Sequence, residues 1–337
     1  MSGLEIMEIG AGATVQDRGR AGWQRYGVTA GGAVDMVALA EGQAILGNGR
    51  DDAALELAVM GGRFRATGPL LVAGSGADMP LKVNGAAQTW RAGVALEAGD
   101  ELTLGPARGG VYGYLHVAGG IRSPVVLGAR STHLRAGLGL VPEAGVTLEA
   151  GRSGGTPGQG LPAPDYFSRR SLRAMWGPQS AVFPEEVRAG FAAATFRVTS
   201  QRDRQGVRLE PDCGPLESAE GLTIVSDAVV LGDVQVTGDG QPAVLLADRQ
   251  PTGGYPRIAT VIGADIHVLA QMPAGTRFRL EMVSRDAAVA ALGRLRAEIA
   301  ALPGRVAPLR RDPHDMDDLL AHTLIGGVVR GDEDDGD

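Results

Sequence analysis

The chain has 337 residues with 44% hydrophobic content, enough to bury a core and to form two domains of ordinary size. It carries 32 basic and 39 acidic residues, and the acids gathered in the C-terminal DEDDGD leave the rest close to neutral. This balance excludes the basic surface of a nucleic-acid-binding protein, and no run of about 18 apolar residues indicates a membrane span. No charged leader opens the sequence, so we expect a cytoplasmic protein.

The first half of the chain consists of short apolar runs bounded by glycine, proline, asparagine or aspartate. Runs such as PLLVAG (69–74) and YGYLHVAGG (112–120) are typical of strands in an all-β barrel or sandwich. A helix is expected over 35–48, with Asp35 as N-cap and Gly47 and Asn48 as its stop. Ser75 does not fit the GxSxG pattern of a nucleophile and is interpreted as a loop serine. We therefore expect a first β lobe over 1–150.

A glycine- and proline-rich segment, 151–165, predicts a linker to a second β lobe over 166–303. Expected strands there are TFRVTS (195–200), AVLLAD (243–248), IATVIG (258–263), IHVLAQ (266–271) and RFRLEMVS (277–284). A helix over 286–302 places four apolar side chains on one stripe: Leu292, Leu295, Ile299 and Leu302. QDRGRAG (16–22) and RDRQGVR (202–208) resemble each other weakly, which hints at two related lobes. The tail, 304–337, ends in an acidic run that we expect to be disordered.

Several kinds of site have no basis in the sequence. Cys213 is the only cysteine, so an internal disulfide is excluded, and it has no histidine beside it to activate it. The five histidines are scattered without metal-ligand spacing, so no metal site is predicted. Lys82 is the only lysine and no GxxxxGK[ST] occurs, so any nucleotide would be bound without a P-loop.

The segment DRQPTGGYPRIATV (248–261) allows two interpretations. In the first, Gly253 and Gly254 form a turn with positive φ, Pro256 fixes the next φ, and an ordinary strand follows. In the second, a rigid scaffold presents the polar side chains of this loop to a ligand. Those side chains are Asp248, Arg249, Gln250, Thr252, Tyr255 and Arg257.

Seven motifs, in order, resemble those of the allophanate hydrolase subunit 2 family, also called biotin-dependent carboxyltransferase-like. They are TVQDRGRAGWQRYGV, GAVDMVAL, NGRDDAALE, GYLHVAGGI, VVLGARSTHLRAGLG, SQRDRQGVRLE and GDGQPAVLLADRQPTGGYPRIATVIGAD. The similarity runs from about residue 4 to residue 290. It implies a cyclophilin-like all-β fold in two lobes, with a few short helices.

The resemblance also implies an activity and partners. Family members typically work with a second cyclophilin-like subunit, and the 5-oxoprolinase type also needs a lactamase-like subunit. That complex couples ATP hydrolysis to the opening of 5-oxoproline, giving glutamate. A five-membered lactam is an unactivated amide, and phosphorylation of its oxygen makes it a better electrophile. We expect this chain to be active only in such a complex, which could bind ATP as a whole.

The family motifs suggest which residues form the site. Carried over as catalytic candidates are Asp35, Asp248, Gln250 and Tyr255. Carried over as substrate-binding candidates are Arg20, Arg130, Ser131, Thr132, Asp203, Arg204, Arg208, Thr252, Gly253, Gly254 and Arg257. With this resemblance, the ligand-binding interpretation of the 248–261 loop is preferred.

The sequence departs from the family pattern at a few positions that bear on substrate identity. Gly31 stands where the family usually has serine, which removes a hydroxyl expected beside Asp35. Gln43 replaces an asparagine, and Arg257 replaces a lysine, exchanging a compact ammonium for a planar guanidinium. The segment GLGLVPEAGVTLEAG lacks the usual Gly-Gly-x-Gly-Arg run.

Each candidate also has a structural alternative. Asp35 is either catalytic or only the cap of its helix. The arginines Arg20, Arg204 and Arg208 either bind substrate or form buried ion pairs with Asp17 and Asp203. Arg130 with Ser131 and Thr132 suits an oxyanion, or caps a turn.

Three functions remain open at this stage. The first is the 5-oxoprolinase subunit. The second is carboxyl transfer with a biotin-dependent carboxylase of the urea or allophanate type, with biotin carried by another protein. The third is a non-catalytic regulator that binds a cyclophilin-like inhibitor of a kinase.

Overall fold

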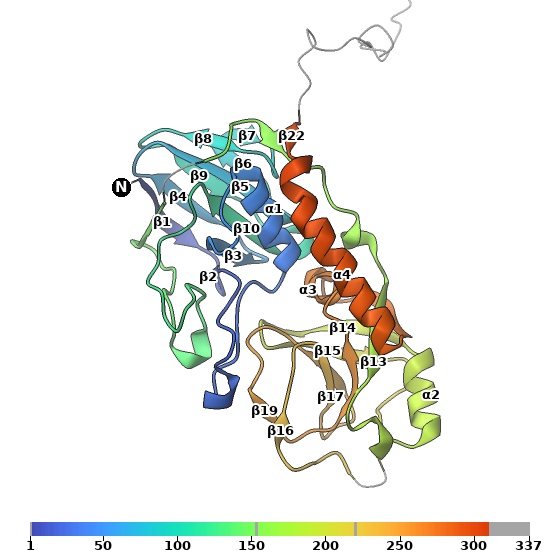
Figure 1. Cartoon of the computed structure of the whole chain (residues 1–337). Coiled ribbons are helices and arrows are strands. Elements are labelled where there is room, and N and C mark those ends of the chain that lie inside the picture. The colour runs from blue at the N-terminus through green and yellow to red at the C-terminus, as the bar shows by residue number, and fades with distance from the viewer. Residues whose placement is uncertain (1, 152–153, 219–220, 310–337) are drawn as a thin grey trace, which may run out of the picture.

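The computed structural model describes residues 2–151, 154–218 and 221–309, and Figure 1 shows them as two lobes with one long helix beside both. The prediction for the acidic tail falls on residues outside this described part. No helix within the described residues is long and apolar enough to cross a membrane.

The N-terminal lobe consists of two antiparallel sheets packed face to face. The six-stranded sheet has the order β11 (Thr147–Glu149), β1 (Gly3–Ile9), β4 (Gly62–Ala66), β9 (Glu101–Leu104), β6 (Leu81–Val83) and β7 (Ala86–Gln88). The five-stranded sheet has the order β2 (Thr14–Gln16), β3 (Ala54–Ala58), β10 (Arg108–Val117), β5 (Leu70–Asp78) and β8 (Val94–Leu96). Side chains from both sheets form one core, which includes Leu4, Phe64, Leu55 and Leu115.

The C-terminal lobe is a closed barrel of seven strands. Their order is β13 (Ser171–Trp176), β20 (Arg257–Val261), β17 (Asp233–Val236), β18 (Pro242–Leu245), β15 (Gly206–Pro211), β14 (Thr195–Arg202) and β21 (Arg277–Met282). A parallel pairing of β13 with β21 closes the barrel. Alternation decides which side chains enter it: in β21, Phe278 and Leu280 are buried while Arg277 and Arg279 are exposed. The expectation of mostly-β lobes with few short helices is thus confirmed.

Two small strand pairs lie outside these sheets. β16 (Asp227–Ala228) pairs with β19 (Thr252–Gly253), and β12 (Gln159–Gly160) pairs with β22 (Ala307–Pro308). The segment predicted as a linker therefore contributes one strand, to which the chain returns after its last helix.

The two predicted helices form at the expected places. α1 (Met36–Leu46) begins because the Asp35 carboxylate accepts hydrogen bonds from the backbone N–H groups of Val37 and Ala38, and it ends at Gly47 with φ 63°. α4 (Arg285–Ala301) buries Ala288 and Ala291, half-buries Leu292, Leu295 and Ile299, and leads into Leu302, which is buried. The other helices are α2 (Glu185–Ala193), α3 (Ile266–Gln271) and the 3-10 turns η1 (Gln24–Tyr26), η2 (Leu134–Ala136), η3 (Tyr166–Ser168), η4 (Ser180–Val182) and η5 (Leu302–Arg305).

Two local expectations are wrong. IHVLAQ forms the helix α3 and not a strand. All six residues are buried, so their sequence shows no alternation of buried and exposed positions that would separate a helix from a strand. Ser75 lies on β5, fully buried, where its hydroxyl bonds the His116 ring at 2.9 Å and the Ala38 carbonyl at 2.7 Å. It is a core serine of a strand and not a loop residue.

A second hydrophobic core joins the lobes. It runs from Ala38, Leu39 and Tyr112 of the N-terminal lobe into the barrel interior at Phe196 and Ile258. α3 packs against β10, and α4 contacts both α1 and β13 (Figure 1). The lobes are therefore held in a fixed arrangement, and polar groups placed between them have a defined geometry.

Candidate functional site

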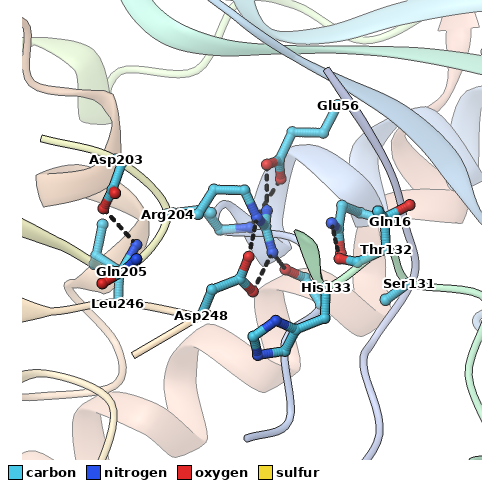
Figure 2. Close-up of polar contacts among 12 residues, drawn as sticks. Gln16, Glu56, Ser131, Thr132, His133, Asp203, Arg204, Gln205, Leu246 and Asp248 are labelled. Carbon is cyan, nitrogen blue, oxygen red and sulfur yellow. Dashed lines mark hydrogen bonds and ion pairs between the residues drawn. The ribbon is translucent and has the colours of Figure 1, made fainter. Parts of the chain in front are cut away.

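The centre of the candidate site is a buried guanidinium, that of Arg204, which sits between two carboxylates (Figure 2). Its Nε and Nη2 donate to the two oxygens of Asp248 at 2.8 and 2.9 Å, and its Nη1 donates to Glu56. A further bond from Nη2 reaches the Gly32 carbonyl at 2.8 Å. Arg204 and Asp248 come from the C-terminal lobe and Glu56 from β3, so this group lies where the lobes meet.

Electrostatics fix Arg204 in its charged form. Burial lowers the pKa of Arg204, but the charges of Glu56 and Asp248 outweigh that effect and raise it. The second oxygen of Glu56 accepts from the Val34 backbone N–H at 3.0 Å and from the Tyr114 hydroxyl at 2.7 Å. Burial, reinforced by the negative charge of Glu56, raises the pKa of Tyr114, so this phenol remains a donor. These contacts make the Arg204 group rigid.

Beside it lies a small space around Gly31 that is bordered by three ionisable side chains. A Cβ built on Gly31 would lie 3.4 Å from Arg20 Nη1, 3.6 Å from Asp248 Oδ1 and 3.9 Å from His133 Cδ2. These are ordinary contact distances, so the space can hold at least one atom. A side chain at position 31 would therefore begin next to Arg20, Asp248 and His133.

Arg20 is 2% exposed and carries an unsatisfied donor. Its Nη2 donates to the Ser131 carbonyl and its Nε to the Val126 carbonyl at 3.4 Å. Within the part of the chain that the structure describes, its Nη1 has no hydrogen-bond partner. Burial lowers the pKa of Arg20, and Asp17 and Asp248 counteract it. A buried N–H without an acceptor is costly, so this atom is suited to meet an oxygen of a ligand.

His133 forms the third side of this space. Its Nε2 lies 3.1 Å from the Thr29 hydroxyl, and that hydroxyl donates to the Arg249 carbonyl at 3.0 Å. Its buried Nδ1 has no partner among the described residues. Burial lowers the pKa of His133, and the positive charges of Arg20 and Arg204 lower it further while Asp248 raises it. The ring is therefore neutral near pH 7, and because Nε2 donates to the Thr29 hydroxyl, Nδ1 is left as an acceptor.

The two similar sequence motifs form similar turns and each supplies one of these arginines. The Asp17 carboxylate accepts from the Gly19 N–H at 2.8 Å, and the Asp203 carboxylate accepts from the Gln205 N–H at 2.7 Å. Asp17 also accepts from the Ser131 hydroxyl and from the Arg130 N–H at 2.6 Å. Asp17 thus positions the turn that carries Arg20, and exposed Asp203 shapes the turn that carries Arg204.

Arg130, Ser131 and Thr132 lie next to Arg20 but point away from the Gly31 space. The Arg130 guanidinium donates to the Ser123 carbonyl, and the Thr132 hydroxyl donates to the Leu140 carbonyl. The Ser131 and Thr132 side chains are fully buried and bonded within the lobe. Their evident contribution is to hold the segment whose backbone carbonyl binds Arg20.

Asp35 lies in a second polar group between the lobes. Its Oδ1 caps α1, and its Oδ2 accepts from the Tyr166 hydroxyl at 2.9 Å and the Gln271 amide at 2.8 Å. Burial raises the pKa of Asp35, and the hydrogen bonds to the carboxylate oppose that shift. Its backbone N–H donates to Tyr114, which links it to Glu56. Asp35 is thus fully buried and connected to the Arg204 group through one tyrosine.

The 248–261 loop is divided between the site and the barrel. Asp248 enters the Arg204 group, whereas the Gln250 amide bonds Gln235 at 2.8 Å. Buried Arg257 pairs with Asp227 and with Asp233, and its Nε donates to Gln179 at 2.8 Å. Thr252, Gly253 and Gly254 form or flank β19, and Tyr255 is 41% exposed.

One expectation for this loop is wrong. Gly253 and Gly254 are absent from the described glycines with positive φ, so neither supplies the left-handed turn. A Cβ on Gly253 would instead lie 2.3 Å from the Gln235 amide nitrogen, so the buried Gln235 side chain would have to shift.

Arg208 and Gln43 lie apart from the candidate site. Arg208 pairs with Asp239 on the barrel. The Gln43 amide donates to the Asp52 carbonyl at 2.8 Å and to the Arg50 carbonyl at 3.2 Å, which holds the loop after α1.

Sequence reasoning missed Glu56 and His133 as site residues, although both stand in quoted family motifs. Glu56 is the one charged residue of the otherwise apolar strand ALELA, a signal that it needs a buried partner. His133 had no such signal, because its role depends on Arg20 and Asp248, which are distant in sequence.

The chemistry of these groups favours an anionic or amide ligand over a metal. No set of three or more His, Cys, Asp or Glu side chains able to hold a metal occurs in the described ranges. Arg20 offers a donor, Asp248 retains acceptor capacity beyond its two bonds from Arg204, and neutral His133 offers an acceptor at Nδ1. The Nη1 donor of Arg20 is of the kind that stabilises negative charge on an oxygen placed against it.

Comparisons with known proteins give a consistent picture. The family model described as "Carboxyltransferase domain, subdomain A and B" matches residues 26–282. The C-type subunit of Escherichia coli 5-oxoprolinase is 34% identical over 294 residues, covering 86% of this chain and 94% of that protein. The corresponding 5-oxoprolinase protein of Haemophilus influenzae is 34% identical over 292 residues, covering 83% and 91%. The urea amidolyase crystal structure from K. lactis superposes with a TM-score of 0.81 at 23% identity, covering 92% of this chain and 21% of that one.

Proposed function

The chain belongs to the family of carboxyltransferase domains, subdomain A and B, together with the C-type subunits of 5-oxoprolinase, and from this we propose that it is a subunit of an ATP-dependent 5-oxoprolinase. In this proposal the complex hydrolyses 5-oxoproline to glutamate. Its other components are a second cyclophilin-like subunit and a lactamase-like subunit.

The observation that carries the proposal for this chain is the unsatisfied Nη1 of Arg20 facing the Gly31 space. 5-Oxoproline is a five-membered lactam whose ring contains a carbonyl and an N–H group and carries a carboxylate as a substituent. Arg20 Nη1 supplies a donor for one of its oxygens, and Asp248 supplies an acceptor for the N–H. Since Arg204 is already paired with two carboxylates, Arg20 is the guanidinium available to the ligand.

In the reaction, these residues bind and polarise the lactam. Nη1 of Arg20 stabilises negative charge that develops on the lactam oxygen, and the rigid Arg204 group keeps Asp248 in place. ATP would transfer a phosphoryl group to the lactam oxygen with release of ADP; water would then add to the activated ring carbon, and loss of phosphate with cleavage of the C–N bond would give glutamate. The chain has no P-loop sequence and its one lysine, Lys82, is exposed on β6, so we assign ATP to the complex and not to this chain alone.

The experiment is to co-express the chain with its two proposed partner subunits and to assay glutamate formed from 5-oxoproline with and without ATP. Arg20→Gln removes the positive charge and the guanidinium Nη1 donor, and Arg18→Gln, at an exposed arginine on the same turn, is the matched control. We expect ATP-dependent turnover in the wild-type complex, a loss of about 100-fold or more in Arg20→Gln, and little change in Arg18→Gln. Co-purification of the subunits shows that the variant complex assembles. Turnover by the isolated chain, or full activity of Arg20→Gln, would refute the proposal.

The description of the matching family model favours one second candidate, carboxyl transfer. In that case biotin would be carried by another protein, since Lys82 lies in LKV and not in a Met-Lys-Met biotin acceptor. A complex with a biotin carboxylase would then hydrolyse ATP in a bicarbonate-dependent way without any lactam, and the 5-oxoprolinase assay would give no glutamate.

A further inference from the structure

A second, separate place in the fold has the features of a ligand site. A cavity of about 610 Å³ lies between the lobes, bordered by α1, the segment around η3, β13 and α4 and open to solvent on one side. We call it the α4 cavity and define it by Glu41, Arg91, Tyr166, Arg169, Arg173 and Ile299, which line it. Neither Arg20 nor Arg204 borders it, so it is distinct from the candidate site described above. Its volume is in the range of small-molecule sites.

One wall of the cavity contains a buried ion pair between Arg91 and Glu41, and Arg91 has a positive φ. Arg91 is 5% exposed and adopts φ 69°, a left-handed conformation that is unfavourable for a residue with a side chain. Its guanidinium binds both oxygens of Glu41 at 2.7 and 2.8 Å, and its Nε donates to the Pro162 carbonyl at 3.0 Å. Burial raises the pKa of Glu41, and Arg91 counteracts it. These contacts hold the strained residue in position at the cavity wall.

The opposite wall carries excess positive charge. Arg169 and Arg173 both bind the fully buried carboxylate of Asp265, at 3.0 and 2.6 Å. Burial raises the pKa of Asp265, but hydrogen bonds from Arg173 and Arg169 outweigh that effect and lower it. One carboxylate thus faces two guanidinium groups, and the trio retains a net positive charge. The Arg169 and Arg173 side chains are 35% and 27% exposed, so both keep donors open to the cavity.

Apolar side chains line the cavity together with further charged ones, which are Asp165, Arg294, Glu298 and Arg305. Leu295, Ile299 and Leu302 project from α4 and η5, and Leu161 faces them. His267 lies at the edge in a T-shaped contact with Tyr166, and burial together with Arg169 lowers its pKa to about 4, so it adds no positive charge near pH 7. A ligand for this space needs an oxyanion at one end and an apolar body at the other.

We propose that the α4 cavity binds a small organic oxyanion, with its charged group on Arg169 and Arg173 and its apolar body against Leu295 and Ile299. Carboxylates and phosphate esters share this chemistry. The ligand would contact Tyr166, whose hydroxyl bonds Asp35, and Asp35 connects through Tyr114 to Glu56. The cavity therefore borders the hydrogen-bonded residues that support the Arg204 group.

The test is isothermal titration of the full chain with phenyl phosphate and with phenylacetate, the two probes that separate phosphate from carboxylate sources. Inorganic phosphate and acetate serve as probes without an apolar body. We expect one aryl probe to bind with a Kd below about 1 mM and its small counterpart to bind at least about 10-fold more weakly. Absence of binding for both aryl probes up to about 10 mM would overturn the proposal.

Variants on one helix locate the binding. Ile299→Trp fills the cavity and should abolish binding, whereas Val289→Trp, on the outward face of α4 at 62% exposure, should leave it unchanged. Arg294→Ala, at an exposed lining position, should weaken binding about 3- to 10-fold, and Arg296→Ala, exposed but outside the lining, should not. Both arginines are exposed, so their replacement leaves the core intact. If Ile299→Trp does not fold, weaker probe binding in Arg294→Ala than in Arg296→Ala tests whether the probe occupies the α4 cavity.

The binding test does not depend on the proposed enzyme activity. If the aryl probe is lost in Arg20→Gln but retained in Ile299→Trp and Arg294→Ala, it occupies the Gly31 space and the α4 cavity proposal is wrong. If the 5-oxoprolinase assay fails while Ile299→Trp abolishes probe binding, the cavity proposal stands without the enzyme proposal.

Discussion

Arg204 and Glu56 are 148 residues apart in the sequence, yet they form an ion pair in which both side chains are at least nine-tenths buried. The pair joins the barrel to β3 of the other lobe, and Asp248 binds the same guanidinium from the opposite side. The position of Asp248 relative to Arg20 thus depends on how the two lobes are joined.

Removing one member of this pair should be costly. In Glu56→Gln the buried Arg204 keeps only Asp248 as a charged partner, and we expect the free energy of unfolding to fall by about 3–5 kcal/mol. Glu210→Gln is the matched control, because Glu210 pairs with Arg197 at a half-exposed position, and its loss should cost less than about 1 kcal/mol. Urea unfolding followed by circular dichroism measures both. Equal losses in the two variants would contradict a special role for the inter-lobe pair.

Occupying the Gly31 space should block ligand binding. Gly31→Ala introduces strain at φ 62° of about 1–2 kcal/mol and places a methyl group against Arg20 Nη1 and Asp248. Gly137→Ala introduces the same strain, since Gly137 also has φ 62°, but its Cβ would meet open space. We expect similar stability losses in both and a KM for 5-oxoproline raised about 10-fold or more only in the Gly31→Ala complex. A KM that rises equally in both would show that backbone strain, and not occupancy, is responsible.

The two adjacent glycines of the 248–261 loop should differ sharply. Gly253→Ala places a Cβ 2.3 Å from the Gln235 amide, so we expect a loss of about 1–3 kcal/mol. Gly254→Ala meets nothing closer than 3.5 Å and has no positive φ, so its melting temperature should stay close to that of the wild type. Differential scanning calorimetry compares them directly. A larger loss in Gly254→Ala would mean that this loop needs the conformational freedom that its sequence first suggested.

His116 should make the fold weaker in acid. Burial lowers its pKa to about 3 in the folded protein, against about 6.5 when unfolded, so the unfolded state binds more protons in between. Stability from this group is full above about pH 6.5 and is lost as the pH falls towards 3. At pH 5 the loss relative to pH 7 is about 2 kcal/mol. In His116→Gln the fall in unfolding free energy between pH 7 and pH 5 should be about 2 kcal/mol smaller than in the wild type, as measured by urea unfolding at the two pH values. An identical fall in the variant and the wild type would show that His116 does not cause the acid sensitivity.

Features that depend on neighbouring residues were predictable from the sequence. The Asp35 cap and the Gly47 stop define α1 almost to the residue, and the apolar stripe on α4 is half-buried along the helix and buried at Leu302. Both follow from hydrogen bonds or periodicity within a few residues. The family resemblance added the fold, because its motifs span both lobes.

Features that depend on distant residues were not predictable. Arg204 was a candidate, but its pairing with Glu56 and Asp248 requires the two lobes to be joined as they are. The unsatisfied atoms of Arg20 and His133 appear only when all their neighbours are known. Gly253 shows the same limit: the pattern Gly-Gly suggested a turn, while the requirement is space for the Gln235 side chain.

The hydrogen bond from Gln271 to Asp35 has a consequence for how the protein is made. The two residues are 236 positions apart, so at roughly 5–20 residues per second a ribosome adds Gln271 about 12–47 s after Asp35. Tyr166, the other donor to the same carboxylate oxygen, is 131 positions from Asp35 and also arrives late. The two donors to Oδ2 therefore follow Asp35 in order, Tyr166 after 131 positions and Gln271 after 236. The hydrogen bonds that satisfy both oxygens of this buried carboxylate can thus form only after the chain has been synthesised as far as Gln271.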